Sequence, residues 1–314
     1  MRYTLLFRQI FSLLNNLKYL NFDSSAGCSS NLSFYSLHPI DVSSTLLELH
    51  VALDNFNDCI YLLDGCFHQL QTLCVRMFMI PLSDTTISNK EKIPNLRCFF
   101  LHCNTKTKAY GELIVPLLQR MSNLEKLDLY FTVVNKRMFV DGNKLKKNII
   151  NYMSRLKTIS FNIRSIIDLY NQTNLPSNED IRHIFKDFQD NQIICCVDYF
   201  LETDRTEYLI YSYPYRLKDY DQISNNFTGG IFECVRNITL FDEHSFEHEF
   251  FLRISQSFPF MKSLNVMNDK SQKNNLHSRP KKNNQDLPII KYLHLVKLDL
   301  TDAHDDYIKQ FLVD

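Results

Sequence analysis

Two histidines with helical spacing are the first residues in this sequence that could do chemistry. His244 and His248 are four residues apart, with Glu247 between them. On one helix both imidazoles would share a face, as the zinc ligands of metal-dependent hydrolases do. The protease order His-Glu-x-x-His is not met, however, and the adjacent Phe250 and Phe251 favour an amphipathic helix that enters the core. A metal-dependent hydrolase at His244 and His248 is therefore the weakest of the three functions that we consider.

A cysteine–histidine pair is the second candidate for chemistry. Cys98, His102 and Cys103 are close together in the sequence. With His50 they would form a nucleophilic pair if neighbouring strands brought them together, but only sequence proximity supports this hypothesis. The dipeptide Cys195-Cys196 is not expected to be a redox pair, because adjacent strand residues point to opposite faces and would leave one thiol buried and one at an edge.

The remaining candidates favour a structural interpretation. Asp302, Asp305 and Asp306, with His304 among them, precede an expected helix, where the helix dipole favours negative charge, so we interpret them as a cap. The chain has six glycines, and its one adjacent pair, Gly229-Gly230, lacks the context of a phosphate-binding loop. We therefore predict a non-enzymatic protein that uses no cofactor and no metal.

Charge and composition exclude several classes of protein. The 314 residues include 35 Lys and Arg against 35 Asp and Glu, a balance that disfavours nucleic-acid binding. The hydrophobic content of 45 % indicates a folded chain. Thr4 to Leu14 is interrupted by Arg8 and Gln9 and does not resemble a signal peptide, and no apolar run is long enough for a membrane span. With nine scattered cysteines and no CxxC spacing, we expect reduced thiols and a soluble cytoplasmic or nuclear protein.

The strongest signal in the sequence is an internal repeat. The pattern apolar-x-x-apolar-x-apolar occurs nine times, as Leu17-Leu20-Phe22, Leu46-Leu49-Val51, Leu70-Leu73-Val75, Leu96-Phe99-Leu101, Leu124-Leu127-Leu129, Leu156-Ile159-Phe161, Val235-Ile238-Leu240, Met261-Leu264-Val266 and Leu295-Leu298-Leu300. The copies begin 24 to 34 residues apart, except for one step of 79 residues between Leu156 and Val235. Each copy alternates apolar and polar residues at its end, which predicts a short strand with one buried face.

Helical periodicity fills the intervals between these strands. Apolar stripes with helical spacing occur over Tyr110 to Met121, over Leu145 to Met153, at Ile60, Leu63 and Phe67, from Phe246 to Phe258, and over Tyr3 to Leu14. Strands that alternate with helices predict an α/β fold in which a curved parallel sheet is covered by outer helices. The predicted fold is therefore a leucine-rich-repeat-like solenoid.

Two of these strands carry a resemblance to a known family. Asn123 to Leu129 and Leu295 to Leu300 resemble leucine-rich-repeat proteins, and specifically the irregular repeats of F-box leucine-rich-repeat substrate receptors of ubiquitin ligases. The resemblance covers about residues 16–302 and implies a protein that presents a substrate to a ligase. The consensus Asn of such repeats occurs once, as Asn104, so regular Asn-ladder turns are not expected. We find no F-box, so the chain is expected to be a fragment or a diverged relative. A ligase adaptor would bind only if an F-box lies outside this chain.

An insertion interrupts the repeats. We divide the chain into N-terminal repeats (1–156), an insertion (157–234) and C-terminal repeats (235–314). Within the insertion we expect a helix at Ile181 to Phe188 and a β-hairpin made of Gln192 to Glu202 and Glu207 to Tyr213. The hairpin either widens the sheet or presents an exposed aromatic patch to a partner, which would use the tyrosines Tyr199, Tyr208, Tyr211, Tyr213, Tyr215 and Tyr220. Residues 268–286 are basic and nearly free of apolar residues, which predicts a flexible loop.

The polar residues that alternate with the core positions would share one concave surface. The candidate partner-binding residues on it are Glu48, His50, Phe100, Lys126, Asp128, Thr158, Asn237, Thr239, Asn265, Lys297 and Asp299. Their mixture of charge, amide, hydroxyl and aromatic groups suits a protein or peptide partner. We therefore predict a protein-binding repeat module, either a ligase substrate receptor or a free-standing scaffold or inhibitor that binds its partner on the concave face.

Overall fold

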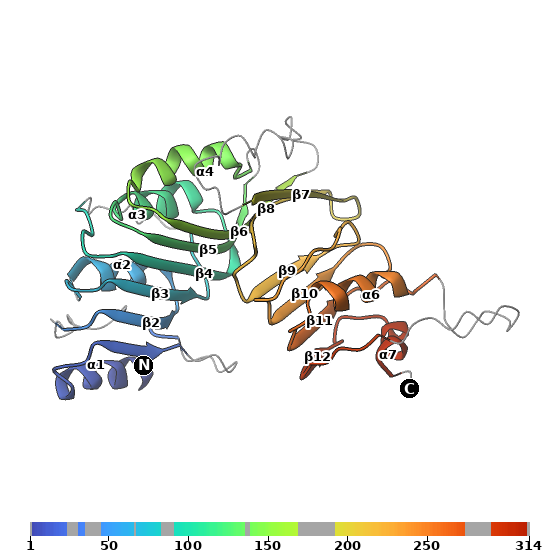
Figure 1. The fold of residues 1–314 in the computed structure, drawn as a ribbon, viewed down its shortest axis with the longest axis horizontal. Coiled ribbons are helices and arrows are strands. Elements are labelled where there is room, and N and C mark those ends of the chain that lie inside the picture. The colour runs from blue at the N-terminus through green and yellow to red at the C-terminus, as the bar shows by residue number, and fades with distance from the viewer. Residues whose placement is uncertain are drawn as a thin grey trace, which may run out of the picture. The chain divides into compact units, whose positions relative to one another are not determined.

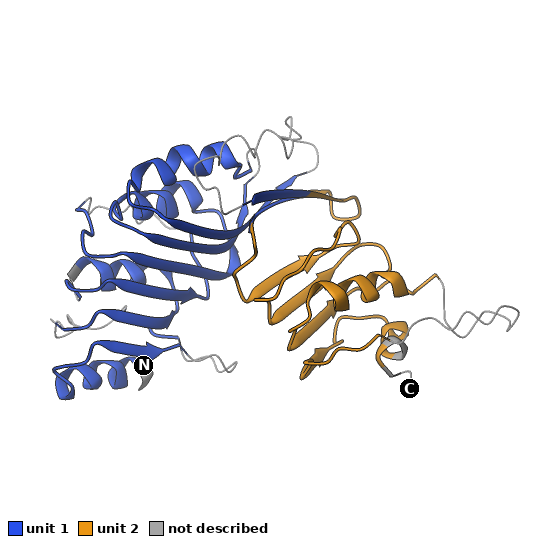
Figure 2. Cartoon of the chain, viewed as in Figure 1, with its two compact units in different colours: residues 1–196, 207–212 blue, residues 197–206, 213–314 orange. Residues whose placement is uncertain are grey.

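The computed structural model describes residues 2–23, 31–34, 45–65, 67–82, 91–135, 139–168, 192–273 and 290–312. The chain forms two compact units, shown in Figure 2. Unit 1 comprises Met1–Cys196 and Glu207–Ser212, and unit 2 comprises Val197–Thr206 and Tyr213–Asp314. Both contain parallel strands and helices, so the chain is α/β, as predicted. No helix in the described ranges is long and apolar enough to pass through a bilayer.

Unit 1 is built on a large, mostly parallel and open sheet. Its eight strands lie in the order β1-β2-β3-β4-β5-β6-β8-β7 (Figure 1). Their bounds are β1 Tyr19–Phe22, β2 Glu48–Leu53, β3 Thr72–Met77, β4 Cys98–Thr107, β5 Lys126–Val134, β6 Thr158–Asp168, β7 Gln192–Phe200 and β8 Arg205–Tyr213. From β1 to β6 each strand pairs in parallel with the next along the chain. Each copy of the repeat pattern in this part of the chain lies on one of these six strands, so its prediction as a strand is confirmed.

One face of the sheet is buried from β2 to β6. Five apolar residues stand directly opposite one another on β2 to β6 and are each 0 % exposed: Leu49, Leu73, Phe99, Leu127 and Ile159. Burying a side chain of this size contributes roughly 1.5–3 kcal/mol. Because side chains alternate along a strand, this burial fixes which residues lie on the other face.

Within the described ranges of unit 1, helices precede β1 and separate β2 from β3, β4 from β5 and β5 from β6, in stretches where helical periodicity predicts them (Figure 1). They are α1 Arg2–Leu13, α2 Phe56–Gly65, α3 Val115–Gln119 and α4 Gly142–Asn148, with a π-helical turn (η1, Tyr110–Ile114) and a 3-10 turn (η2, Ile150–Tyr152). The helix expected over Tyr110 to Met121 is therefore split into η1 and α3. Pro116 explains the split, because it has no N–H to donate to the carbonyl four residues earlier, and a wider π turn relieves the clash.

A reciprocal cap fixes the start of α2. The Asn55 side chain accepts hydrogen bonds from the N–H groups of Asn57 (2.9 Å) and Asp58 (3.3 Å). The Asp58 carboxylate in turn accepts from the Asn55 N–H (3.3 Å) and from the Phe34 N–H (2.6 Å). This is the pattern of a capping box. Asp58 is only 2 % exposed, and burial raises its pKa to about 6 despite these hydrogen bonds.

The β7–β8 hairpin widens the sheet of unit 1 and does not form an exposed tyrosine patch. β8 lies next to β6, and the turn falls at residues 201–204 rather than 203–206. Asp204 has a φ of 49° there, a conformation that Asp tolerates in turns. Four of the six candidate tyrosines are buried, namely Tyr208, Tyr211, Tyr215 and Tyr220. The helix predicted at Ile181 to Phe188 lies outside the described residues.

Unit 2 contains a four-stranded parallel sheet in the order β12-β11-β10-β9 (Figure 1). Its elements are β9 Asp219–Ile223, β10 Asn237–Phe241, α6 His248–Ser257, β11 Ser263–Met267, β12 Lys297–Asp299 and α7 Asp305–Leu312. The last three copies of the repeat pattern lie on β10, β11 and β12. The sequence analysis did not identify β9, because a register shift places Tyr220 and Ile223 opposite Ile238 and Leu240 and breaks the alternation of apolar residues.

The beginning of the basic segment at 268–286 is packed against unit 2. Asn268 and Gln272 are 3 % and 7 % exposed. The Gln272 side chain donates to the Phe246 carbonyl (2.8 Å), and its backbone N–H donates to the Asp306 carboxylate (3.2 Å). Residues 268–273 are thus tied to the start of α6 and to α7, and the rest of the predicted loop lies outside the described residues.

Candidate functional site

The residues opposite the buried face of unit 1 form two straight rows across five strands. We call these two rows the polar face. The first row is Glu48, Thr72, Cys98, Lys126 and Thr158, and the second is His50, Cys74, Phe100, Asp128 and Ser160. All are partly exposed except Ser160, which is 2 % exposed. The parallel register therefore brings together every unit 1 residue that the sequence analysis assigned to partner binding.

An acid–imidazole pair lies at the β2 end of the polar face. His50 Nε2 is 2.7 Å from a Glu48 carboxylate oxygen, and the two side chains are 26 % and 41 % exposed. The Tyr19 ring of β1 lies 5.5 Å from the imidazole ring. The pair holds the imidazole beside a carboxylate at the surface, where it can donate to or accept from a partner.

A lysine–aromatic–aspartate group lies farther along the same face. The Lys126 ammonium stands over the Phe100 ring, 4.8 Å from its centroid, and 3.7 Å from an Asp128 carboxylate oxygen. Lys126 is 41 % exposed, whereas Asp128 is 13 % exposed. Because the ring and the carboxylate both hold the ammonium in place, this cation is positioned in advance for an acidic group on a partner.

The thiol between these two groups is not a nucleophile. In register, Cys74 lies between His50 and Phe100. Burial raises the pKa of Cys74 to about 12, and the nearby Glu48 and Asp128 carboxylates add to the rise. The thiolate is the reactive species, so this thiol stays inert near neutral pH. The hypothesis of a Cys98 or Cys103 pair with His50 is wrong, because His50 stands opposite Cys74.

A third row of side chains was missed by the sequence analysis. It continues the polar face with Arg76, His102 and Tyr130, which stand opposite one another on β3, β4 and β5. The His102 and Tyr130 rings stack, with centroids 4.5 Å apart and planes 20° apart. Arg76 lies 3.7 Å from the Asp23 carboxylate. The sequence does contain a signal for this row. In β5 the alternation of buried apolar residues continues beyond the six-residue pattern, from Leu129 through Phe131 to Val133.

Unit 2 has corresponding rows whose side chains largely bond to each other. Asn237 Nδ2 donates to Asp219 (2.7 Å), and Thr239 Oγ1 donates to Asp221 (2.9 Å), so both candidates bond to β9. The remaining candidates of this unit are Asn265, which is partly exposed, Lys297, which is exposed, and Asp299, which accepts from the Thr301 hydroxyl at 2.7 Å. The sequence did not predict β9. Its residues Asp219 and Asp221, which accept these hydrogen bonds, were therefore not predicted either.

The two histidines of the hydrolase hypothesis do not share a helix. α6 begins at His248, and His244 lies four residues before it in a bend. The His244 Nδ1 is instead 3.3 Å from the Asp242 carboxylate. Within the described ranges, no cluster of three or more His, Cys, Asp or Glu side chains could hold a metal ion. The geometry that suggested zinc ligation is therefore not formed.

The other two candidate groups have structural positions. Asp305 and Asp306 occupy the first turn of α7, as predicted for a cap, and the Asp306 N–H donates to His304 Nδ1 (3.2 Å). Cys195 and Cys196 are both partly exposed on β7, at the edge of the sheet. The expectation of one buried and one edge thiol is thus wrong, because β7 is the outermost of the described strands of this sheet and both thiols keep partial exposure.

Comparison of the chain with protein-family models, with characterised proteins and with solved structures finds no match.

Proposed function

We propose that this chain is a non-enzymatic protein-binding module, a leucine-rich-repeat-like solenoid that binds its partner on the polar face of unit 1. The observation that carries the proposal is the continuous register of the first residues of β2 to β6, which aligns polar and aromatic side chains in two rows. A rigid sheet that presents such rows offers a preorganised surface, so a partner orders few side chains on binding.

The chemistry of the polar face supports a protein partner. Its central groups are an aromatic ring with a cation above it, an acid–imidazole pair and a partly buried carboxylate. Aromatic anchors in a polar surround are typical of protein interfaces. A single exposed lysine on these rows, Lys126, does not form the row of cations that a phosphate backbone requires.

The test compares two lysines in the same local sequence. Lys126 and Lys297 both begin a strand with the sequence Lys-Leu-Asp, but only Lys126 lies on the polar face of unit 1. We expect Lys126→Glu to lose the partner captured from a cell lysate, because it places a carboxylate beside Asp128. Lys297→Glu, the matched control, is expected to retain it. Equal capture by the two variants, both folded by circular dichroism, would refute the polar face as the binding site.

On the basis of the resemblance to F-box receptors, we propose a specific form of this function, in which the bound protein is a ligase substrate. Adaptor and cullin subunits recovered with the partner would support that form. A direct one-to-one complex with the partner that slows the partner's activity would instead support the scaffold or inhibitor form. Both forms use the same polar face, so the Lys126→Glu variant tests them equally.

A further inference from the structure

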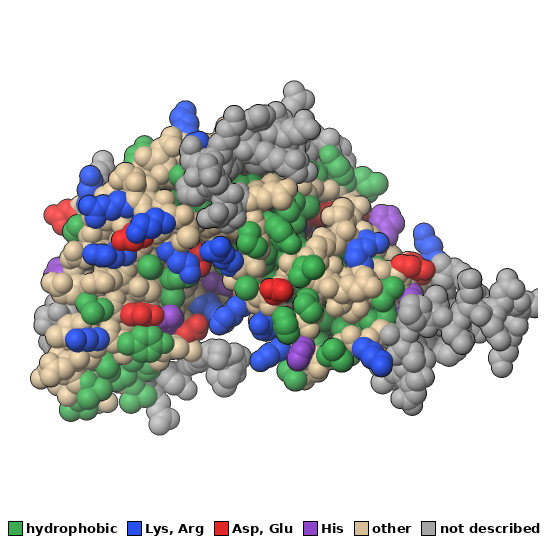
Figure 3. All heavy atoms as spheres, in the orientation of Figure 1, with side chains coloured by type: hydrophobic (Ala, Val, Ile, Leu, Met, Phe, Trp, Pro, Cys, Tyr) green, Lys and Arg blue, Asp and Glu red, His purple; other side chains and the backbone are tan. Residues whose placement is uncertain are grey.

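A column of basic side chains lies at the end of unit 2 where its strands begin. Lys218, Arg236 and Lys262 immediately precede β9, β10 and β11. The Arg236 N–H donates to the Lys218 carbonyl (2.7 Å), and the Lys262 N–H donates to the Arg236 carbonyl (2.8 Å). The three residues therefore stack at the spacing of adjacent strands, about 4.8 Å. Figure 3 shows basic side chains and a histidine gathered at this lower left end of unit 2.

At the same positions in unit 1, the column of charged side chains is neutralised by ion pairs between its own members. Arg97, Glu125 and Lys157 precede β4, β5 and β6 and are joined by the same backbone hydrogen bonds. There the central Glu125 lies 3.5 Å from Arg97 and 2.6 Å from Lys157. The cations, the Lys157 ammonium first, lower the pKa of Glu125. In unit 2 the central position is an arginine, so the column keeps its full positive charge.

The basic column has no acidic partner in the part of the chain that the structure describes. No carboxylate of those residues forms an ion pair with Lys218, Arg236 or Lys262, and both lysines are exposed. Within the described ranges, the Arg236 guanidinium donates to the backbone carbonyls of Glu233 (2.6 Å) and Val235 (2.9 Å). These bonds fix the guanidinium without neutralising it, so an acidic group from outside can still pair with it.

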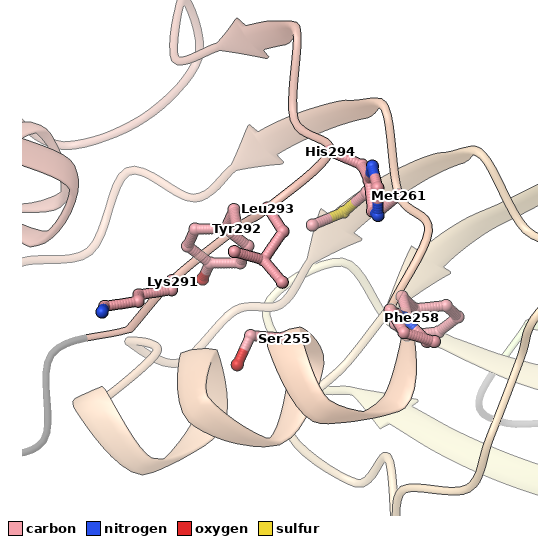
Figure 4. A pocket seen from close by; sticks show the side chains of 8 residues that line it. Ser255, Phe258, Met261, Lys291, Tyr292, Leu293 and His294 are labelled. Atoms are coloured by element: carbon pink, nitrogen blue, oxygen red, sulfur yellow. The ribbon is translucent and has the colours of Figure 1, made fainter.

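Aromatic contacts join the column to a neighbouring pocket. The Arg236 guanidinium lies 5.4 Å from the centroid of Phe260, whose ring lies 5.5 Å from His294. His294 also lines a pocket of about 120 Å³. Figure 4 shows that Ser255 and Phe258 come from α6 and its end, whereas the segment from Lys291 to His294 passes across them. The pocket is lined by apolar side chains such as Phe258 and Met261 together with polar ones such as Ser255, and its volume is that of one side chain.

This end of unit 2 also exposes large apolar side chains. Phe260 is 42 % exposed, Leu293 is 82 % exposed and Val296 is 83 % exposed. Apolar groups exposed together in this way are typical of interaction sites. Cations, an aromatic ring and a small pocket of mixed lining thus lie together at this end of unit 2.

We propose that the strand-start end of unit 2 binds an acidic peptide segment of a partner protein, with its carboxylates on Lys218, Arg236 and Lys262 and one aliphatic side chain in the His294 pocket. Three cations are too few for the extended charge that nucleic acid requires, and the chain as a whole carries no net positive charge. A pocket with the volume of one side chain beside the cations favours a peptide in particular, because a nucleic acid has no such side chain.

The test measures binding of a fluorescein-labelled hexaglutamate peptide with a C-terminal leucine to the full chain by fluorescence anisotropy. We expect salt-sensitive binding that weakens at least tenfold in the double variant Lys218→Glu, Lys262→Glu. That variant places carboxylates on both sides of Arg236 and keeps its backbone hydrogen bonds. The milder Lys218→Gln, Lys262→Gln variant is expected to lose affinity to a lesser degree, with an unchanged circular dichroism spectrum.

The matched control changes the net charge of the chain by the same amount, but at a different place. Lys92→Glu with Lys147→Glu alters two exposed lysines of unit 1 and is expected to bind the peptide as the unaltered chain does. Equal weakening in the control and in the Lys218, Lys262 variant would overturn the proposed site. Tighter binding of a single-stranded DNA hexamer than of the peptide would overturn the proposed partner. A peptide with serine in place of leucine is expected to bind several-fold more weakly, and equal affinity would overturn the role of the pocket.

Discussion

Replacing Arg164 by Met is expected to destabilise unit 1 strongly, because it leaves a buried carboxylate without its cation. Arg164 on β6 and Glu207 on β8 form an ion pair at 2.7 Å, and the two side chains are 4 % and 0 % exposed. Removing one partner of a buried pair costs about 3–5 kcal/mol, since the remaining charge keeps its desolvation penalty without its attraction. Methionine preserves much of the arginine's volume, so packing contributes little to this cost.

The expected loss is large enough to measure by thermal and urea unfolding. For a domain of about 150–250 residues, 1 kcal/mol shifts the midpoint of thermal unfolding by about 2–4 °C, so Arg164→Met is expected to lower it by roughly 6–20 °C. The double variant Arg164→Met, Glu207→Leu removes both charges and is expected to recover most or all of the loss. The recovery distinguishes an unpaired charge from a packing defect, because a cavity would remain in the double variant.

An exposed ion pair provides the matched control. Lys157 and Glu125 are as close as the buried pair, at 2.6 Å, but Lys157 is 72 % exposed. Lys157→Met is expected to leave the unfolding midpoint nearly unchanged, because water solvates the remaining Glu125. If Arg164→Met shifts the midpoint no more than Lys157→Met does, the pairing of β6 with β8 described above is wrong.

Two further predictions concern titration. The pKa of Asp58 is raised to about 6, above that of the unfolded chain, so the folded state binds more protons and stability falls as pH rises from about 4 to 6. Asp58→Asn keeps an acceptor for the Phe34 N–H and is expected to flatten that decline, adding about 1 kcal/mol at pH 8 in urea unfolding; an unchanged pH profile would contradict the cause given. Iodoacetamide at pH 7.5 is expected to modify the exposed Cys234 well before Cys74, as followed by peptide mass spectrometry, and the reverse order would contradict the burial of Cys74.

The strand positions of this protein follow from a short-range pattern. In Leu127-Asp128-Leu129, for example, the alternation alone predicts a strand and assigns Asp128 to the face opposite the two leucines. The structure places Leu127 and Leu129 in the core, each at 0 % exposure, and Asp128 on the polar face. Such a prediction succeeds because it depends on the side-chain direction within one strand. For the same reason the candidates Glu48, Lys126 and Asp128 all lie on the polar face.

The errors of the sequence-based predictions have both local and long-range causes. The histidine hypothesis placed His244 on a helix, but α6 begins only at His248. The ion pairs of Glu125 with Arg97 and Lys157 depend on neighbouring strands, which hydrophobic periodicity within one segment does not describe. The sequence did not predict β9, because β9 pairs with β10 through a register shift that cannot be read from the sequence of β9 alone.

Most of the strands, several helices and the sidedness of each predicted strand follow from the sequence, since these depend on the order of apolar and polar residues within a short segment. Which side chains are neutralised depends instead on tertiary contacts. At the residues that precede the strands, the two units differ in the type of the central side chain. Glu125 pairs with Arg97 and Lys157, whereas Arg236 leaves Lys218 and Lys262 without a counter-charge among the described residues. Charge pairing acts through space over a few ångströms, and parallel strand pairing brings together residues that lie about 18 to 32 positions apart in the chain.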